Sequence, residues 1–170
     1  MNKKIIRLAI TLLTVAILVT PVLAVPTQGQ KVPITLQFNP EGNTGGVTKV
    51  TPSGIRHWTN RDKVYSLIFS IDGAEPIPGL DNAISSYKWW TDDEGMGNGI
   101  YHEFNVLTFE GGTFEGNSKL KFTDFDYGTR TFNVEAHGVF HGTGVFEGQT
   151  IVAGYEGPSG GTWSGYLLKP

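Results

Sequence analysis

Hydrophobic and polar residues alternate along four stretches of the chain. Residues 32–38 read Val-Pro-Ile-Thr-Leu-Gln-Phe, and residues 65–71 read Tyr-Ser-Leu-Ile-Phe-Ser-Ile, so that every second side chain is apolar or aromatic. A similar spacing recurs in 114–122 and 132–141. A period of two is typical of a β-strand with one buried face. We therefore predict a strand in each of these ranges.

The chain lacks the pattern of a long helix. No stretch of a dozen residues carries an apolar stripe at 3.6-residue spacing, and the best helical candidate, 80–87, is one or two turns long. The composition agrees, since 23 glycines disfavour helices, while 4 Trp, 6 Tyr and 10 Phe favour strands. The sequence predicts an all-β protein.

Glycines divide the second half of the chain at regular places. Breaks at 111–112, 128, 142–144 and 157–161 separate five predicted strands from Ile100 onward. Short turns between successive strands are typical of an antiparallel meander.

A short motif, Gly-x-Phe-x-Gly, occurs at 112–116, 138–142 and 144–148. Glycine inside a strand permits bulges and strong coiling, and a nearby Phe can cover the bare backbone. Coiled strands can close on themselves, which removes exposed sheet edges. We therefore expect a single antiparallel meander β-barrel of about eight strands rather than a two-sheet sandwich.

Two segments do not alternate and are predicted outside the sheet. Residues 73–99 contain Pro76 and Pro78 and an acidic run, so we expect a long excursion with one short strand around 86–90. Residues 56–62 combine polar and aromatic side chains and are predicted as a turn before the strand of Tyr65, which either lines a barrel mouth or is a hairpin without a binding role. Long loops on rigid barrels are where binding is often found.

The N-terminal residues have the pattern of a secretory signal. Three basic residues precede the uncharged, largely apolar run 8–24, and cleavage is expected after Ala24. An uncleaved membrane anchor is the alternative, but the run is short for a bilayer span. The predicted organisation is a signal peptide (1–24), a short flexible segment (25–30) and one β-barrel domain (31–170).

Cleavage would place the protein outside the cytoplasm. Removal of three basic and no acidic residues changes the net charge from −3 to −6. The chain has no cysteine and no Asn-x-Ser/Thr triplet, which is typical of a prokaryotic exported protein. We predict a secreted or extracytoplasmic location, in the periplasm or at the cell surface, with no membrane attachment after cleavage.

Composition and motifs exclude several classes of function. Without cysteine there is no disulfide framework, thiolate zinc site or cysteine nucleophile. The acidic balance provides little basis for a nucleic-acid-binding surface. No nucleophile elbow, phosphate-binding loop, dinucleotide fingerprint or zincin motif is present. No cofactor and no catalysis are assigned.

Two groups of residues resemble metal sites. His137 and His141 lie four apart in a predicted strand, which separates them by about 13 Å, too far to share an ion. Glu135 with His137, or His141 with a cross-strand residue, are geometrically possible ligands, but nothing supplies a third. The run Asp124-Phe-Asp126-Tyr-Gly128 resembles the start of a calcium loop, but the acidic residue of a bidentate ligand does not follow. Turn preference explains Asp and Gly there. No metal is assigned.

One acidic residue is a candidate for acid–base chemistry. His102 and Glu103 are adjacent in a predicted strand, so they face opposite sides and one of them faces the barrel interior. Burial would shift the pKa of an inward Glu or His and suit it to proton transfer. The alternative is a residue at the barrel mouth without a chemical role.

Tryptophans are the other candidates. Trp89 and Trp90 are neighbours, so in a strand one of them points away from the core. Exposed Trp can stack on sugar rings or cap an apolar pocket, and the alternative is packing under the 73–99 segment. Trp163 is predicted in the core. The candidate ligand-binding residues are Trp58, Trp89, Trp90, Tyr101 and Glu103.

The stretch His141-Gly-Thr-Gly-Val-Phe-Glu-Gly-Gln149 resembles the Gly-x-Gly-x-Phe-x-Gly stretch of allene oxide cyclase-like and dirigent-like barrels. The resemblance covers about 138–154. It implies an eight-stranded barrel whose apolar interior holds a small hydrophobic or phenolic molecule. No catalytic residue is carried over from these families.

Three functions follow as hypotheses. The first is an exported barrel that binds a small apolar or aromatic ligand. The second is a carbohydrate or surface-polymer binding module that uses loop tryptophans, and the third is an allene oxide cyclase-like isomerase with an inward acid such as Glu103. Apolar residues on both faces of 104–109 also allow a partner subunit to cover the outside, so a homo-oligomer is considered.

Overall fold

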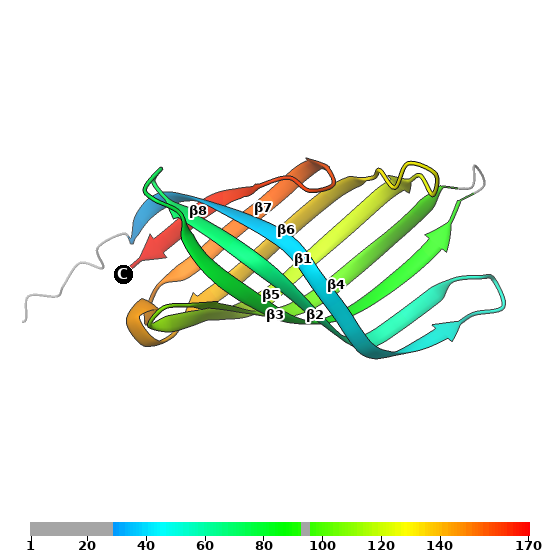
Figure 1. The fold of residues 1–170 in the computed structure, drawn as a ribbon, viewed down its shortest axis with the longest axis horizontal. Coiled ribbons are helices and arrows are strands. Elements are labelled where there is room, and N and C mark those ends of the chain that lie inside the picture. The colour runs from blue at the N-terminus through cyan, green and yellow to red at the C-terminus, as the bar shows by residue number, and fades with distance from the viewer. Residues whose placement is uncertain (1–28, 93–95) are drawn as a thin grey trace, which may run out of the picture.

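The computed structural model describes residues 29–92 and 96–170, and Figure 1 shows the fold as a ribbon. These residues form eight antiparallel strands and one short 3₁₀ turn, η1. In chain order the elements are β1 (Gln30–Val50), β2 (Arg56–Ile71), β3 (Ile77–Thr91), β4 (Gly97–Phe109), β5 (Gly112–Phe125), β6 (Asn133–Gly142), η1 (Gly144–Phe146), β7 (Thr150–Pro158) and β8 (Trp163–Lys169).

The strands form one closed barrel in sequence order. Each strand pairs with the next, and β8 closes the ring against β1, with Gln30 opposite Lys169 and Leu36 opposite Trp163. The prediction of an all-β antiparallel meander barrel is confirmed, as are the glycine breaks between its last five strands. The predicted signal peptide and most of segment 25–30 lie outside the described residues.

Alternation along the strands builds the core. In β1, Val32, Ile34 and Leu36 face inward and are buried, while the residues between them are exposed. The buried apolar side chains form one cluster. Its fully buried members are Leu36, Leu67, Phe69, Leu107, Phe114, Phe140, Ile151 and Leu167.

One end of the barrel is closed by aromatic packing. The turn η1 follows β6 and brings Phe146 against Phe114, with ring centroids 4.7 Å apart, and near Phe109, at 6.1 Å. Phe69 lies 5.3 Å from Phe109 on the other side. Aromatic pairs at these separations add to the free energy gained from burial. This end of the barrel is therefore filled by side chains.

Aromatic rings cover glycine backbone inside the barrel, as the sequence predicts. A Cβ placed on Gly99 would lie 2.2 Å from Cζ of Phe122, its register partner on β5. A Cβ on Gly138 would lie 2.4 Å from Cζ of Phe140. No real Cβ fits at such distances, so a side chain at either glycine would displace a ring.

Segment 73–99 corrects a prediction. It is neither an excursion from the sheet nor helical at 80–87, because β3 occupies Ile77–Thr91 and pairs with both β2 and β4. The physical reason is that β3 carries polar or small side chains on its inward face and apolar side chains on its outward face. The inward side chains of β3 include the buried Asp81, Ala83 and Ser85, so apolar alternation does not mark the strand.

The predicted turn at 56–62 is also wrong. These residues begin β2 and pair with the end of β1, with Arg56 opposite Val50 and Asp62 opposite Thr44. The turn lies at 51–55, where the Thr51 amide donates to the Ile55 carbonyl at 2.9 Å. The resulting β1–β2 hairpin, cyan in Figure 1, projects past the barrel wall.

The outer face of β2–β4 carries exposed apolar side chains, including Ile68, Leu80, Ile84 and Phe104, the last at 43% exposure. A partner subunit over this face stays a prediction. Among the residues that the structure describes, no helix has the length and apolar character to cross a bilayer.

Candidate functional site

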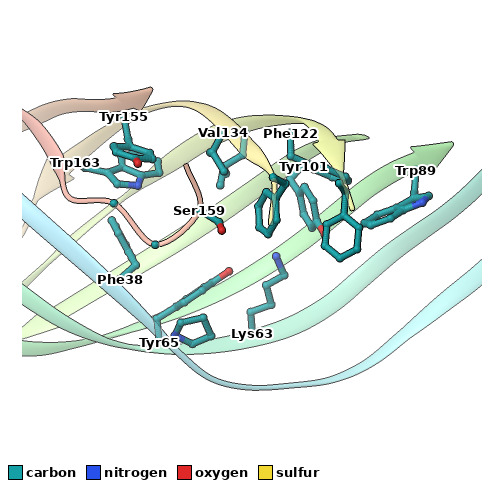
Figure 2. Close-up of a pocket in the computed structure, with 16 residues that line it drawn as sticks. Phe38, Lys63, Tyr65, Trp89, Tyr101, Phe122, Val134, Tyr155, Ser159 and Trp163 are labelled. Atoms are coloured by element: carbon teal, nitrogen blue, oxygen red, sulfur yellow. The ribbon is translucent and has the colours of Figure 1, made fainter. Parts of the chain in front are cut away.

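The end of the barrel opposite η1 is hollow. A cavity of about 250 Å³ opens there, among the inward side chains of several strands and the turn between β7 and β8 (Figure 2). Its lining is mostly aromatic and apolar. The lining residues are Phe38, Pro40, Lys63, Tyr65, Trp89, Tyr101, Leu120, Phe122, Phe125, Phe132, Val134, Tyr155, Ser159, Gly160, Gly161 and Trp163.

Aromatic contacts hold the cavity wall in place. The Trp89 ring lies 4.7 Å from Phe122 and 5.1 Å from Phe125, and its indole Nε1 donates to the hydroxyl of Tyr127 at 2.9 Å. Phe122 in turn covers Gly99. Trp89 is therefore fixed at both its apolar face and its polar edge, as suits a preformed wall.

Lys63 is the basic side chain of the cavity, and Figure 2 shows it pointing into the hollow. Its Nζ lies 2.5 Å from Oε1 of Glu103 and 4.1 Å from the centroid of the Tyr101 ring. The two side chains are only 16% and 4% exposed. Burial of both charges is costly, and their mutual attraction and the aromatic ring offset that cost. The pair places a neutral but strongly polar group beside an apolar hollow.

Two tyrosines flank this pair. Burial, followed by the charge of Glu103, raises the pKa of Tyr65, and burial, followed by the nearby Tyr87, raises the pKa of Tyr101. Both phenols therefore keep their protons at physiological pH. The Tyr65 hydroxyl donates to Oε1 of Glu103 at 3.4 Å. The carboxylate is thus held by an ammonium and a phenol.

A hydrogen-bonded chain of buried polar residues lies deeper in the barrel. Ser118 Oγ donates to Asn105 Oδ1, and Asn105 Nδ2 donates to Asp81 Oδ2, both at 2.8 Å. Asp81 is fully buried, and its Oδ1 has no hydrogen-bond partner among the described residues. Burial raises the pKa of Asp81 to about 6, against the opposing effect of the Asn105 hydrogen bond. Asp81 is therefore protonated in mildly acidic solution.

The inward positions of β4 show how these regions follow one another. Tyr101 lines the cavity, Glu103 and Asn105 lie in the polar layer, and Leu107 and Phe109 belong to the apolar core. These five residues alternate with outward ones, as the strand period requires. One strand thus passes from cavity to polar layer to packed core.

Two further hollows adjoin the cavity. The larger, about 490 Å³, lies at the mouth, shares Trp89, Tyr101 and Phe125 with the cavity, and includes Trp58 among its walls. Its rim carries two arginines, Arg56 and Arg130.

The second hollow measures about 240 Å³ and lies beside the β1 register shift between Pro40 and Gly42. It shares Lys63, Tyr65 and Tyr101 with the cavity. Arg61 forms part of its wall, donating to the hydroxyl of Tyr87 at 2.8 Å and also to Oδ1 of Asn43.

The sequence-predicted residues fall in different places. Trp89 and Tyr101 line the cavity. Trp58 lies in the mouth hollow and stacks on Tyr87 at 4.5 Å. Glu103 faces inward and reaches the cavity through Lys63, whereas its neighbour His102 is exposed, as the strand geometry predicts. Trp90 follows Trp89 on the opposite side of β3, and its ring centroid lies 5.6 Å from Nζ of Lys88.

Sequence reasoning missed Lys63, Phe125 and Phe132 on the cavity wall, and Asp81 below it. A signal for Lys63 was present, because it continues the inward phase of Tyr65 and Leu67 by two residues. Asp81 has no comparable signal, because the alternation of apolar residues does not predict β3 as a strand. Trp163, predicted in the core, is 7% exposed and lies between core and cavity.

No group of three or more His, Asp or Glu side chains is placed to share a metal ion among residues 29–92 and 96–170. The Asp126 carboxylate instead stabilises the turn between β5 and β6, where its Oδ1 accepts hydrogen bonds from the amides of Gly128 at 2.7 Å and Thr129 at 3.3 Å. These bonds lower the pKa of Asp126.

Comparison with known proteins adds no further guide to this site, since no family model, curated protein or solved structure matches the chain.

Proposed function

We propose that this protein acts outside the cytoplasm and binds a small apolar or aromatic molecule in the barrel cavity. The observation that carries the proposal is a hollow of about 250 Å³ with mostly aromatic walls, in a barrel whose other end is packed. Apolar hollows gain free energy when an apolar ligand fills them. The resemblance to allene oxide cyclase-like and dirigent-like barrels agrees with this use of the interior.

The size of the cavity limits the ligand. An apolar cavity of about 150 Å³ accommodates one benzene ring, and typical drug-sized pockets begin near 300 Å³. A volume of about 250 Å³ therefore suits one ring with a substituent, or a compact bicyclic molecule. Long acyl chains and oligosaccharides exceed this volume and would have to extend into the adjoining hollows.

A matched pair of variants on one strand tests the proposal. Val134 and Val139 both lie on β6, but only Val134 lines the cavity. Val134→Trp places an indole in the hollow, whereas Val139→Trp adds the same bulk on the opposite face. Binding of toluene, indole and naphthalene by residues 25–170 is measured by calorimetry and ligand-observed NMR.

We expect the wild type and Val139→Trp to bind at least one of these compounds with the same affinity. Val134→Trp should bind it at least tenfold more weakly, because the cavity is occupied. Failure of the wild type to bind any of the three, or equal binding by all proteins, would contradict the proposal.

Glycan binding is a second candidate, favoured by the hollow at the mouth. Trp58, Trp89 and Tyr127 give it aromatic surface, and Arg56 and Arg130 give it hydrogen-bond donors. Aromatic faces with nearby donors suit sugar rings. A change in tryptophan fluorescence with a member of a glycan panel, lost in Trp58→Ala, is expected for this function. An unchanged spectrum across the panel removes it.

A further inference from the structure

We propose that the cavity selects an uncharged ligand with one aromatic ring and one acceptor oxygen, and that the Lys63 ammonium donates a hydrogen bond to that oxygen. This inference rests on the proposed binding function and names the class of molecule bound. It concerns Lys63, which the sequence did not single out, and the charges around it.

The first step is the hydrogen-bonding capacity of Lys63. An ammonium group has three N–H donors. One is directed to Glu103 Oε1 at 2.5 Å, and the Tyr101 ring lies 4.1 Å away. The side chain also lines the cavity and points into it (Figure 2). A donor of Lys63 is therefore available to a bound molecule.

The second step is the cost of leaving that donor without a partner. A ligand that fills the cavity displaces water from it. A pure hydrocarbon offers no acceptor, so the ammonium would lose solvent without gaining a hydrogen bond, which is unfavourable. A carbonyl or ether oxygen at the same place restores the bond. The site therefore favours an oxygen-bearing ring over its hydrocarbon analogue.

The third step is the charge balance. The charged groups near the cavity are Lys63, which lines it, Arg61 in the wall of the adjoining hollow, and the buried Asp81 and Glu103, two of each sign when Asp81 is ionised. Lys63 is already paired with Glu103, so a carboxylate ligand would bring a second anion next to that carboxylate. It would also lose its hydration in a largely apolar hollow. A neutral acceptor avoids both costs.

Three molecules of nearly equal shape separate these possibilities. Acetophenone has a ring and a carbonyl oxygen, α-methylstyrene replaces the oxygen with a methylene group, and benzoate replaces the methyl group with a charged oxygen. Each has one ring and a three-atom substituent, which suits a hollow of about 250 Å³. Affinities are measured at pH 7.5 by calorimetry on residues 25–170.

We expect acetophenone to bind about tenfold more tightly than either α-methylstyrene or benzoate, in line with a hydrogen bond from a charged donor. The carbonyl carbon of ¹³C-labelled acetophenone should also shift downfield in the complex, as it does when its oxygen accepts a hydrogen bond. These measurements need no variant.

Variants then assign the effect to Lys63. Lys63→Met removes the donor but leaves Glu103 without its ammonium, so Lys63→Met/Glu103→Gln removes both charges together. In either variant that folds, the preference for acetophenone over α-methylstyrene should fall below twofold, and the downfield shift should disappear. Lys119→Met, on the exposed outer face of β5, is the matched control and should keep the wild-type preference.

The outcomes separate this inference from the binding function. Equal affinities for all three compounds, or tightest binding of benzoate, would overturn the inference while the binding function stands. A preference that survives Lys63→Met/Glu103→Gln would overturn it as well. No binding of any of the three, together with no binding of toluene, indole or naphthalene, would overturn both.

Discussion

The two ends of the barrel are built from the same strands but filled differently. At the η1 end, Phe114, Phe146 and Phe109 close the interior, and Phe114 and the adjacent Phe69 are fully buried. At the other end, Trp89, Phe122 and Phe125 stand around a hollow of about 250 Å³. The hollow end carries more aromatic side chains than the packed end, so the number of rings does not explain which end is filled.

The difference lies in what supports the rings. Phe114 and Phe146 stack on each other and Phe109 meets both edge-on, whereas Trp89 packs on Phe122, and Phe122 lies over the Gly99 backbone of the barrel wall. Rings that lie against the wall leave the axis of the barrel open. Between the two ends, the chain of Asp81, Asn105 and Ser118 places polar groups where an apolar side chain could have filled the space. The comparison associates stability with the packed end, and the hollow end is where we propose that a ligand binds.

The largest expected effect is on the free energy of unfolding, when one aromatic ring is removed from either end in separate variants. Phe114→Ala should lower the free energy of unfolding by about 3–5 kcal/mol, because it creates a cavity in close-packed surroundings. Phe132→Ala, on the wall of the existing hollow, should cost less than about half as much, since its ring already borders empty space. Urea denaturation of both variants makes the measurement. Equal losses would show that the two ends do not differ in their contribution to stability.

A smaller expected effect tests the polar layer that lies between the two ends of the barrel. The pKa of Asp81 rises from 3.8 to about 6 on burial, so between these pH values the folded state holds the proton more tightly than the unfolded state. The contribution of Asp81 to the unfolding free energy therefore falls as the pH rises from about 4 to about 6. Relative to Asp81→Asn, the wild type should lose about 2–3 kcal/mol over this range.

Chemical denaturation at several pH values checks this expectation. The matched control is Asp62→Asn, an exposed carboxylate on the neighbouring strand β2. Its pH profile should parallel that of the wild type. A wild type whose stability, compared with Asp81→Asn, rises or stays level from pH 4 to 6 would argue against a buried, protonated Asp81.

The smallest effect concerns the turn at the open end. The lowered pKa of Asp126 means that its ionised form stabilises the β5–β6 turn, and this contribution is lost as the pH falls through the folded-state value. Asp126→Ala should therefore lower the melting temperature slightly at pH 7, and the difference from wild type should shrink in acid. Thermal unfolding at pH 7 and pH 3 measures it. A difference that grows in acid would contradict the assignment.

The fold could be predicted largely from period-two patterns and glycine breaks. Strands such as 32–38 and 65–71 have apolar inward positions, and breaks such as Gly128 fall at observed turns. Strand β3 was missed because its inward side chains at 81–85 are polar or small, while Leu80 and Ile84 are exposed on the outside. Hydrophobic alternation detects an apolar interior, and here the interior is polar.

The site was accessible to sequence reasoning only in part. Trp89 and Tyr101 were predicted from residue type, and Glu103 from its strand phase. The pairing of Lys63 with Glu103 joins residues that are 40 positions apart, and it depends on the registers of β2, β3 and β4. The β2 register contains an irregularity between Trp58 and Arg61 that no local pattern reveals. Contacts of this kind require the assembled sheet.

The closing strand has a consequence for the behaviour of several copies together. β8 has seven residues and meets β7 over only five register pairs, from Thr150–Leu168 to Gly154–Ser164. If β8 detaches, β1 and β7 each present a row of free amide and carbonyl groups, which can accept the β8 of another molecule. Strand β8, which closes the barrel, is therefore also the segment best suited to strand exchange between copies. Detachment of β8 would remove Trp163 from the cavity wall.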